Sequence, residues 1–491
     1  MTETNHIPGT KQAPEHLGRV LILGLGKTGK VAARYCVGLI GSRVECVFIA
    51  AGKRNDDACA FAAEMERLGA TVAFETETIE GEYDLCIASP GISQFSDFYK
   101  NAAAASKEVV SEIEFAWRES AADSVWVAIT GTNGKTTTTS LTAHLLQKAG
   151  MRAAAVGNIG DVCLEAVAAG GTDVYVAEVS SYQLASTHDF APNVAVLLNI
   201  TPDHLKWHGS MKEYEAAKLR VFKNLAHVPG SVAVLDATND LVRETVKKFK
   251  AIPEEDRGSA YIPLGTMAGY RESMRNRCGA KNAAYIDETD ALCILFNDDL
   301  HVLSRTDDLQ LKGEHNFANA LAASCAAVAL GVDDNVIASA LESFAPLEHR
   351  LEPCGVVRGI ACYNDSKATN VDATLVALTS FPAGKLVVLL GGDDKGTALD
   401  ELVALARKQA HHVVCFGAAG PRFAAAFDDA GAGDMVIRAG KLEEALDAAL
   451  DCANDGDAVV LSPACASFDE FNSFEHRGAE FKRYVAERAA R

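Results

Sequence analysis

Residues 125–149 read VWVAITGTNGKTTTTSLTAHLLQKA, and this stretch decides the fold class of the chain. An apolar run, Val125–Ile129, enters the small and polar loop Thr130–Thr137, and a segment of helical length, Thr138–Ala149, follows. A buried strand that leads through a glycine-containing loop into a helix is the building unit of α/β proteins. Backbone N–H groups of such a loop, together with its lysine, can surround phosphate oxygens. The stretch therefore predicts a phosphate-binding loop in a parallel sheet.

The spacing in this loop differs from the usual pattern G-x-x-x-x-G-K-[ST], because Ile129 stands where the first glycine is expected. The alternative is a polar turn that contains Lys-Thr by coincidence. Threonine is a poor helix former, so helix propensity does not explain the run of threonines after Lys135. We therefore favour a nucleotide-binding loop, with Lys135 on the β- and γ-phosphates and the Thr136 hydroxyl on Mg²⁺.

Apolar runs of strand length alternate with helix-length segments along the rest of the chain, which predicts an α/β fold with three domains in series. The expected organisation is a disordered tail at residues 1–17, followed by domains at 18–122, 123–346 and 347–491. Residues 251–311 are less regular, and we expect them to form a peripheral antiparallel addition to the second domain.

Composition excludes several classes of protein. The net charge of −20 argues against a general nucleic-acid-binding protein, although a local basic cleft could still bind polyphosphate. No apolar run reaches the ~20 residues of a membrane-spanning helix, and the N-terminus does not resemble a secretory signal. The 13 cysteines include no Cys-x-x-Cys pair, which favours reduced core thiols. We therefore expect a cytoplasmic protein that binds small molecules, without nucleic acid or membrane insertion.

A second glycine loop, GLGKTG at residues 24–29, follows the first expected strand and fits the dinucleotide fingerprint G-x-G-x-x-G. That fingerprint expects a carboxylate about 20 residues further on, at the end of the second strand. The sequence there reads FIAAG at residues 48–52, which disfavours a NAD-type site. A site for another diphosphate and a tight turn without a ligand both remain open, and we favour the diphosphate site.

Further polar residues stand near the ends of expected strands in the second domain. Glu178 lies in an apolar run, and a buried carboxylate is costly unless it is paired or binds a metal. His204 closes TPDH after the next strand, where a helix cap by Asp203 is the alternative to a ligand site. Spacing alone places Lys218 on a solvated helix face. The carboxamides of EHNFANA (314–320) could contact an adenine edge or cap a helix.

The third domain has three polar loops, NDSKATN at 364–370, GGDDKG at 391–396 and SPACAS at 462–467, each after an expected strand. Loops at the carboxyl ends of parallel strands meet at one edge of a sheet. The three loops therefore predict a binding site.

These motifs, in this order and together with His349-Arg350, resemble the Mur ligase family of peptidoglycan synthesis, which also includes folylpolyglutamate synthetase. The opening GLGKTG and the closing LSPACASFDEFNSFEHRG are most similar to the family members that add D-glutamate. The resemblance covers nearly all of the chain after residue 18. It implies an N-terminal Rossmann-like UDP-binding domain, a central P-loop-type ATPase domain and a C-terminal Rossmann-like domain that binds the amino acid.

The activity implied by the resemblance is ATP-dependent addition of D-glutamate to UDP-N-acetylmuramoyl-L-alanine through an acyl phosphate. The implied cofactors are ATP, Mg²⁺ at two sites and a lysine carbamylated by CO₂. We expect a monomer. Another Mur-type or folylpolyglutamate-type ligase is the nearest alternative. A dinucleotide oxidoreductase and a non-catalytic nucleotide-binding regulator are alternatives from other classes.

The resemblance also implies a role for individual residues at matching positions. The catalytic residues would be Lys135, His204 and Lys218, and Lys218 would carry the carbamate. The ATP-binding residues would be Gly131, Thr132, Asn133, Gly134, Lys135, Thr136, Thr137, Asn316, Asn319, Arg350 and Asp365. The metal ligands would be Thr136, Glu178, His204 and the carbamate of Lys218. The UDP-substrate would contact Lys27, Thr28, Gly29, Ser89 and Asn158. D-glutamate would contact Lys367, Thr369, Lys395, Ser467, Phe468 and Phe474.

Two positions depart from the family pattern. An Asp-x-Arg element that usually follows the second strand reads Ala-Gly-Lys53-Arg54 here. An Asp-Arg pair that is common shortly after the TPDH segment reads Lys206-Trp207. The resemblance therefore does not identify the residues that contact the uridine.

Overall fold

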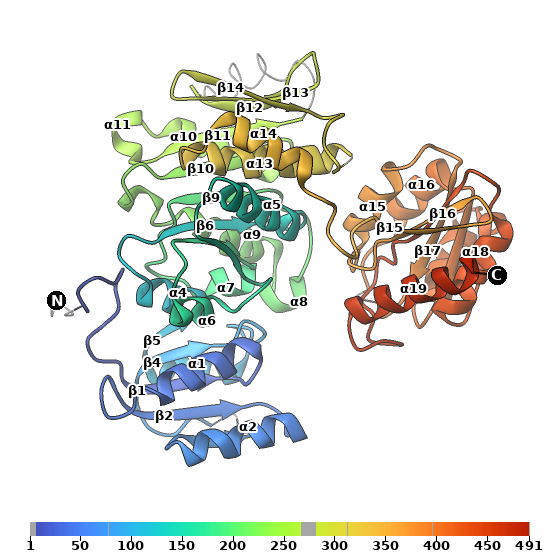
Figure 1. The fold of residues 1–491 in the computed structure, drawn as a ribbon. Helices are drawn as coiled ribbons and strands as arrows, with labels where there is room; N and C mark the ends of the chain where they lie inside the picture. The colour runs from blue at the N-terminus through green and yellow to red at the C-terminus, as the bar shows by residue number, and fades with distance from the viewer. Residues whose placement is uncertain (1–5, 77, 267–280, 312, 395, 491) are drawn as a thin grey trace. The chain divides into compact units, whose positions relative to one another are not determined.

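The computed structural model describes residues 6–76, 78–266, 281–311, 313–394 and 396–490. The chain divides into two compact units, one made of residues up to Leu309 with Asn316–Phe344, and one made of Gln310–His315 with Ala345–Arg491. The described residues form three sheets, two in the first unit and one in the second (Figure 1). The predicted α/β class is confirmed, and the predicted domain boundaries stay predictions.

The first sheet is parallel, with the strand order β3-β2-β1-β4-β5. Its strands are β1 (Gly18–Leu23), β2 (Val44–Ala51), β3 (Thr71–Phe74), β4 (Tyr83–Ala88) and β5 (Ser106–Ser111). Its helices are α1 (Lys27–Val37), α2 (Asp56–Arg67) and α3 (Asp97–Ala104). Side chains of α1 and α2 pack on one face and those of α3 on the other, so β1 and β4 are apolar on both faces. Strand order reverses at β1, which is where doubly wound sheets bind ligands.

The second sheet has the order β14-β13-β12-β11-β10-β9-β6-β8-β7. Its strands are β6 (Val125–Thr130), β7 (Ala153–Gly157), β8 (Val174–Glu178), β9 (Val194–Leu197), β10 (Val232–Asp236), β11 (Ala260–Gly265), β12 (Ala283–Ile286), β13 (Ala291–Phe296) and β14 (Asp299–Arg305). The antiparallel addition predicted for residues 251–311 is confirmed for β13 and β14 but is wrong for β11 and β12, which continue the parallel sheet. Helical segments cross over from β10 to β11, and such a crossover returns the chain in the same direction.

The helical segments of this part of the chain are α4 (Glu112–Glu119), α5 (Lys135–Lys148), α6 (Cys163–Ala169), α7 (Ser181–Ala185), α8 (Leu205–His208), α9 (Met211–Leu219), η1 (Arg220–Phe222), η2 (Leu225–His227), α10 (Asp240–Ala251), α11 (Glu254–Arg257), α13 (Glu314–Ala329) and α14 (Asp334–Ser343). None of the helices in the described residues combines the length and apolarity needed to cross a membrane. The cysteines in the same residues are free thiols, most of them buried.

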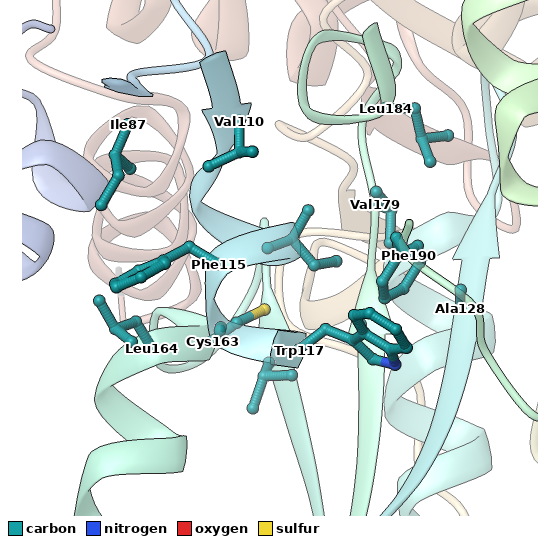
Figure 2. Close-up of a cluster of buried hydrophobic side chains, with 14 of the residues drawn as sticks. Ile87, Val110, Phe115, Trp117, Ala128, Cys163, Leu164, Val179, Leu184 and Phe190 are labelled. Carbon is teal, nitrogen blue, oxygen red and sulfur yellow. The ribbon is translucent and has the colours of Figure 1, made fainter. Parts of the chain in front are cut away.

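Helix α4 joins the first two sheets into one core. Figure 2 shows Phe115 beside Leu164 and Cys163, and Trp117 beside Phe190. The rings of Trp117 and Phe190 meet edge to face at 6.2 Å between centroids. Apolar residues of both sheets therefore belong to one buried cluster, which explains why they form one compact unit.

The predicted disordered tail is wrong for residues 6–17. Ala13 and Leu17 are buried, and the backbone N–H groups of Lys11 and Gln12 donate to the carbonyls of Ser120 and Arg118 at 2.8 and 3.0 Å. The segment has no apolar periodicity, so sequence reasoning missed it, but its backbone satisfies carbonyls at the end of α4.

The second unit contains a sheet with the order β15-β16-β20-β17-β18-β19, parallel except for the β15–β16 pair. Its strands are β15 (Glu352–Val357), β16 (Ile360–Asn364), β17 (Leu386–Gly391), β18 (His412–Phe416), β19 (Val436–Arg438) and β20 (Ala458–Leu461). Its helical segments are α15 (Val371–Thr379), α16 (Asp400–Gln409), α17 (Gly420–Asp429), η3 (Gly433–Met435), α18 (Leu442–Cys452) and α19 (Phe474–Ala489). The three polar loops follow β16, β20 and β17, which are neighbours, so they share one edge.

Candidate active site

The loop Gly131–Gly134 connects β6 to α5 at the point where the strand order of the second sheet reverses, between β8 and β9. Gly134 has φ +83°, and a Cβ there would lie 2.4 Å from Asn319 Oδ1, so only glycine fits. Lys135, Thr136 and Thr137 form the first turn of α5. The positive end of this helix dipole thus faces the loop, as anion sites require.

A segment after β9 fixes the backbone of the loop. The Asn199 side chain accepts a hydrogen bond from the Asn133 N–H at 2.7 Å and donates one to the Asn133 carbonyl at 3.1 Å. The Thr132 hydroxyl lies 2.9 Å from the Tyr214 hydroxyl and accepts from the Thr201 N–H at 3.0 Å. Sequence reasoning missed Asn199 and Tyr214, because their contacts with the loop exist only in the folded chain.

Two lysines converge on one carbonyl of the loop. Lys135 Nζ donates to Gly131 O at 2.9 Å and to Thr132 O at 2.8 Å, and Lys218 Nζ donates to the same Gly131 O at 2.7 Å. Lys218 is 2% exposed. Burial, and then the charge of Lys135, hold the pKa of Lys218 well below its usual range. The solvated-face interpretation of Lys218 is wrong, because α9 turns this residue into the core.

Glu178 ends β8 beside this pair of lysines and is 2% exposed. Its Oε1 accepts a hydrogen bond from Asn158 Nδ2 at 2.9 Å, whereas its buried Oε2 has no hydrogen-bond partner in the described structure. A buried carboxylate oxygen without a partner is costly, and a hard cation is its natural complement.

His204 precedes α8 with φ +56°, and its ring lies 4.8 Å from that of Tyr182. Its Nε2 lies 3.4 Å from Asp203 Oδ2, and Asp203 also accepts the His204 N–H. His208, which sequence reasoning missed, is fully buried and its Nε2 lies 2.9 Å from Ser181 Oγ. Burial, His204 and Lys218 lower the pKa of His208 to about 4, so its imidazole is neutral.

The carboxamides of α13 also reach the loop. Asn319 Oδ1 accepts a hydrogen bond from Thr138 Oγ1 at 3.2 Å, and its Nδ2 lies 3.3 Å from Asn316 Oδ1. The structure thus places Asn316 and Asn319 next to the first turn of α5. Their role towards adenine stays a prediction.

In the first sheet, Gly24–Gly29 follows β1 and is packed tightly at its two ends. A Cβ on Gly29 would lie 2.0 Å from the Gly24 carbonyl, and Ser89, which follows β4, donates to that carbonyl at 3.1 Å. Lys27 is exposed and donates to Gly160 O at 2.9 Å. The structure therefore groups Lys27, Gly29 and Ser89, with Thr28 between them, at the crevice of this sheet.

In the second unit, Asp365 follows β16 and is buried. Its carboxylate accepts from Ser462 Oγ at 2.7 Å, so two of the polar loops touch. Burial raises the pKa of Asp365 to about 7, against the opposing influence of Ser462 and Arg350. A β-bridge between Asp393 and Ala466 connects the GGDDKG loop to the SPACAS loop. The predicted convergence of the three loops is therefore confirmed.

Lys367 and Phe474 meet at this edge, with Nζ 3.8 Å from the ring centroid. The buried Ser467 hydroxyl has no hydrogen-bond partner in the described residues. Phe468 is 69% exposed, and the Thr369 N–H donates to the Lys367 carbonyl at 2.8 Å. Lys395 lies outside the described residues. The assignment of these residues to D-glutamate stays a prediction.

Arg477 of α19 is a residue that sequence reasoning missed. It is fully buried and donates to Ser366 Oγ and O and to the carbonyls of Cys465 and Ala466, at 2.8 to 3.0 Å. Burial lowers the pKa of this guanidinium to about 10. One side chain therefore holds two of the polar loops together.

Two groups of carboxylates and histidine in the described residues lie close enough to hold a metal, and neither contains a predicted ligand. Glu108, Glu114 and Asp189 surround Arg118, and Glu348 and Glu352 pair with Lys482. These ion pairs explain both groups without a metal.

Comparison with known proteins agrees with this arrangement. The Mur ligase middle domain matches residues 129–327, and the Mur ligase, glutamate ligase domain matches residues 349–465. A UDP-N-acetylmuramoylalanine--D-glutamate ligase from Cytophaga hutchinsonii is 36% identical over 476 residues, 96% of this chain and 99% of that protein. The chain belongs to the Mur ligase family. A ligase of the same name from Thermoanaerobacter pseudethanolicus is 37% identical over 84% of this chain and 86% of its own length.

Solved structures of Mur ligases share the fold. MurF from Acinetobacter baumannii aligns with a TM-score of 0.57 at 18% identity, covering 96% of this chain and 93% of that one. UDP-N-acetylmuramate-alanine ligase from Thermotoga maritima aligns with a TM-score of 0.53 at 17% identity, covering 96% and 99%. At this identity the likeness concerns the fold alone. The family resemblance inferred from the motifs is confirmed.

Proposed function

We propose that this Mur ligase adds D-glutamate to UDP-N-acetylmuramoyl-L-alanine at the expense of ATP, in the synthesis of a peptidoglycan precursor. The observation that carries the proposal is the convergence of Lys135 and the buried Lys218 on Gly131 O, beside a buried carboxylate oxygen of Glu178 that has no hydrogen-bond partner in the described residues. The relatives that align with almost the whole chain bear the name of this ligase. We take the proposed substrates from that name. The enzyme acts as a cytoplasmic monomer.

The loop Gly131–Thr137 binds the phosphates of ATP. Its backbone N–H groups and the positive end of α5 face the oxygens, and Lys135 moves from the loop carbonyls to the β- and γ-phosphates. Asn316 and Asn319 of α13 contact the adenine. Arg350 contacts the phosphates and Asp365 the ribose.

The residues present fit a divalent cation, since the buried Glu178 Oε2 has no hydrogen-bond partner in the described residues. Thr136, Glu178, His204 and a carbamate on Lys218 would hold Mg²⁺ at two sites. The chemistry that such a cation would supply there is positive charge opposite the transferred phosphoryl group.

Lys218 is suited to carbamylation, because its lowered pKa favours the neutral amine. Nζ attacks the carbon of CO₂, the N–C bond forms, one C=O electron pair moves to oxygen, and Nζ releases a proton to solvent. The product is an anion beside Lys135. A neutral amine that shares the Gly131 carbonyl with Lys135 is thereby replaced by a group that attracts the Lys135 ammonium.

The reaction then follows from charge and position. An oxygen of the alanyl carboxylate attacks the γ-phosphorus of ATP, and ADP leaves with the electron pair of the broken P–O bond. The amine of D-glutamate attacks the carbonyl carbon of this acyl phosphate, loses a proton, and phosphate leaves with the C–O electron pair. Lys367, Thr369, Lys395, Ser467, Phe468 and Phe474 bind D-glutamate, and Lys27, Thr28, Gly29, Ser89 and Asn158 bind the UDP-substrate.

A phosphate-release assay with a panel of amino acids tests the proposal. Turnover should require ATP, UDP-N-acetylmuramoyl-L-alanine and D-glutamate together. Turnover with L-lysine or diaminopimelate and none with D-glutamate would contradict the substrate. Turnover with a folate and L-glutamate instead would identify the chain as a folylpolyglutamate-type ligase.

A second experiment concerns the carbamate. Lys218→Ala should lose activity, and short-chain carboxylates should restore part of it by replacing the carbamate oxygens. Mass spectrometry of the wild-type chain after trapping with an alkylating reagent should show the added CO₂ on Lys218. Unchanged activity of Lys218→Ala would rule out this role.

A further inference from the structure

A helix of one turn follows one of the proposed metal ligands, and its own sequence does little to fix it. Helix α8 (Leu205–His208) begins after His204, whose φ of +56° is unfavourable for a residue with a side chain. Such a conformation persists only where the surroundings hold it, and a single turn is not stable by itself. The first two residues of the turn are exposed. Trp207, His208 and the His204 ring therefore provide the side-chain contacts that hold it.

His208 connects this turn to the strand that carries the buried carboxylate. The residue is fully buried, and its Nε2 lies 2.9 Å from Ser181 Oγ. Ser181 is buried too and begins α7, three residues after Glu178 at the end of β8. The other ring nitrogen, Nδ1, has no hydrogen-bond partner in the described residues. The bond between His208 and Ser181 therefore joins the segment of His204 to the segment of Glu178.

Two tyrosines extend the contacts of His208 to other proposed ligands. Its ring packs against Tyr182 at 5.7 Å and against Tyr214 at 5.2 Å between centroids. The Tyr182 ring also lies 4.8 Å from that of His204, and Lys218 Nζ lies 4.7 Å from the centroid of the Tyr214 ring. His208 thus belongs to a group of packed rings whose outer members contact His204 and Lys218.

We propose that His208 is a positioning residue for the cation site, and that its hydrogen bond to Ser181 fixes the His204 imidazole relative to Glu178 and Lys218. This inference rests on the proposed function, since it concerns the residues that would hold Mg²⁺ there. His208 acts through α8 and its packed neighbours without touching the cation. Residues that orient metal ligands in this way change metal affinity or activity by about 10-fold to 100-fold when they are replaced.

Binding of Mn²⁺ to the full chain with ADP, followed by the paramagnetic resonance signal of free Mn²⁺, tests the role without turnover, because Mn²⁺ takes the same hard ligands as Mg²⁺. His208→Phe keeps an aromatic ring but loses the bond to Ser181, and should weaken Mn²⁺ binding about tenfold. Ser181→Ala removes the same bond from the other side and should weaken binding by the same factor. The double variant should lose no more than either single variant, because one interaction can be removed only once.

His208→Gln should rescue the site. Its amide can form a hydrogen bond to Ser181, so Mn²⁺ binding should return to within about threefold of the wild-type value. Ser231→Ala is the matched control for a loss of stability, since Ser231 is buried in the same unit and donates to Leu225 O at 2.6 Å. It should lower stability in urea as Ser181→Ala does, and leave Mn²⁺ binding unchanged.

Wild-type Mn²⁺ binding in either His208→Phe or Ser181→Ala would overturn the proposal, and so would losses that add in the double variant. Ser181→Ala decides the matter if His208→Phe fails to fold. The phosphate-release assay of the wild-type chain separates this inference from the proposed function. Turnover with D-glutamate alongside variants that bind Mn²⁺ normally refutes the role of His208 alone. Absence of Mn²⁺ binding by the wild-type chain would contradict both proposals.

Discussion

Two glycine loops of this chain each connect a strand with parallel neighbours to the helix that follows it, yet their surroundings differ. The loop Gly24–Gly29 is confined by its own backbone, since Gly29 packs on the Gly24 carbonyl and Ser89 closes the turn. The loop Gly131–Gly134 is held by side chains from other segments, including Asn199 and Lys218. The first loop provides a closely packed backbone and one exposed lysine. In the second loop, two lysines donate hydrogen bonds to a single carbonyl.

The difference shows that a glycine pattern specifies where a phosphate can lie, but not what happens to it. Binding a diphosphate requires close approach of backbone and a helix N-terminus, which glycine spacing provides. Transfer of a phosphoryl group requires fixed charges at the developing negative charge, which distant residues must supply.

A short turn after β7 contacts both sites. Asn158 donates to Glu178 Oε1 near the second loop, and Gly160 O accepts a hydrogen bond from Lys27 of the first loop. Helix α6 follows this turn, and the buried Glu112 of α4 accepts the N–H of Leu164 in its first turn at 2.6 Å. The position of this turn therefore depends on Glu112.

The largest effect is expected from removing the lysine of each loop. Lys135→Ala should lower kcat on the order of a thousandfold, because a cation at the transferred phosphoryl group is lost. Lys27→Ala should raise only the KM for the UDP-substrate, about tenfold, since it removes one contact to charged oxygens. Steady-state kinetics measure both, with Lys148→Ala on the exposed side of α5 as the control. Equal effects of both substitutions on kcat would contradict the different roles that are assigned to the two loops.

A methyl group tests the backbone confinement of the first loop. Gly29→Ala should destabilise the first unit by about 3 kcal/mol, because its Cβ would meet the Gly24 carbonyl at 2.0 Å. Gly26→Ala is the matched control, since no atom of the described residues lies within 4 Å of a Cβ there. Urea unfolding measures the difference, and equal stability of the two variants would show that the loop adapts.

The stability of the folded chain should depend on pH through Glu112, which holds the turn between the two loops. Burial raises the pKa of this carboxyl from 4.5 to about 7, so the folded chain retains a proton that the unfolded chain releases above pH 4.5. The stability of the wild-type chain relative to Glu112→Gln should therefore fall by roughly 2 kcal/mol from pH 5 to pH 8. Urea unfolding across this range checks the slope. Glu165→Gln, an exposed position in α6, should show no such trend.

The smallest effect concerns the side-chain support of the second loop. Asn199→Ala should cost about 1 kcal/mol of stability and raise the KM for ATP, because the Asn133 backbone loses both of its partners. Asn193→Ala is a matched control at the other end of β9, where the side chain accepts the Trp126 N–H at 2.9 Å. It should lower stability similarly without changing the KM for ATP. A change in that KM in both variants would indicate a general effect of β9.

Much of the architecture was predictable because buried parallel strands are continuous apolar runs. The strands that carry Thr130, Glu178 and Leu461 all stand out in this way. The short or half-exposed strands β3 and β15 were missed, since their sequences lack such runs. The pairing of β11 was assigned wrongly, because its direction depends on a crossover and not on composition.

The sequence by itself determined the α/β class, the family and the positions of both glycine loops, since these depend on local spacing and on motif order. The tertiary structure alone decided the state of Lys218, Glu178 and Arg477. Each is an ionisable residue whose burial and partners come from segments far away in the chain. Desolvation is a property of the packed environment, so residue type and spacing do not determine it.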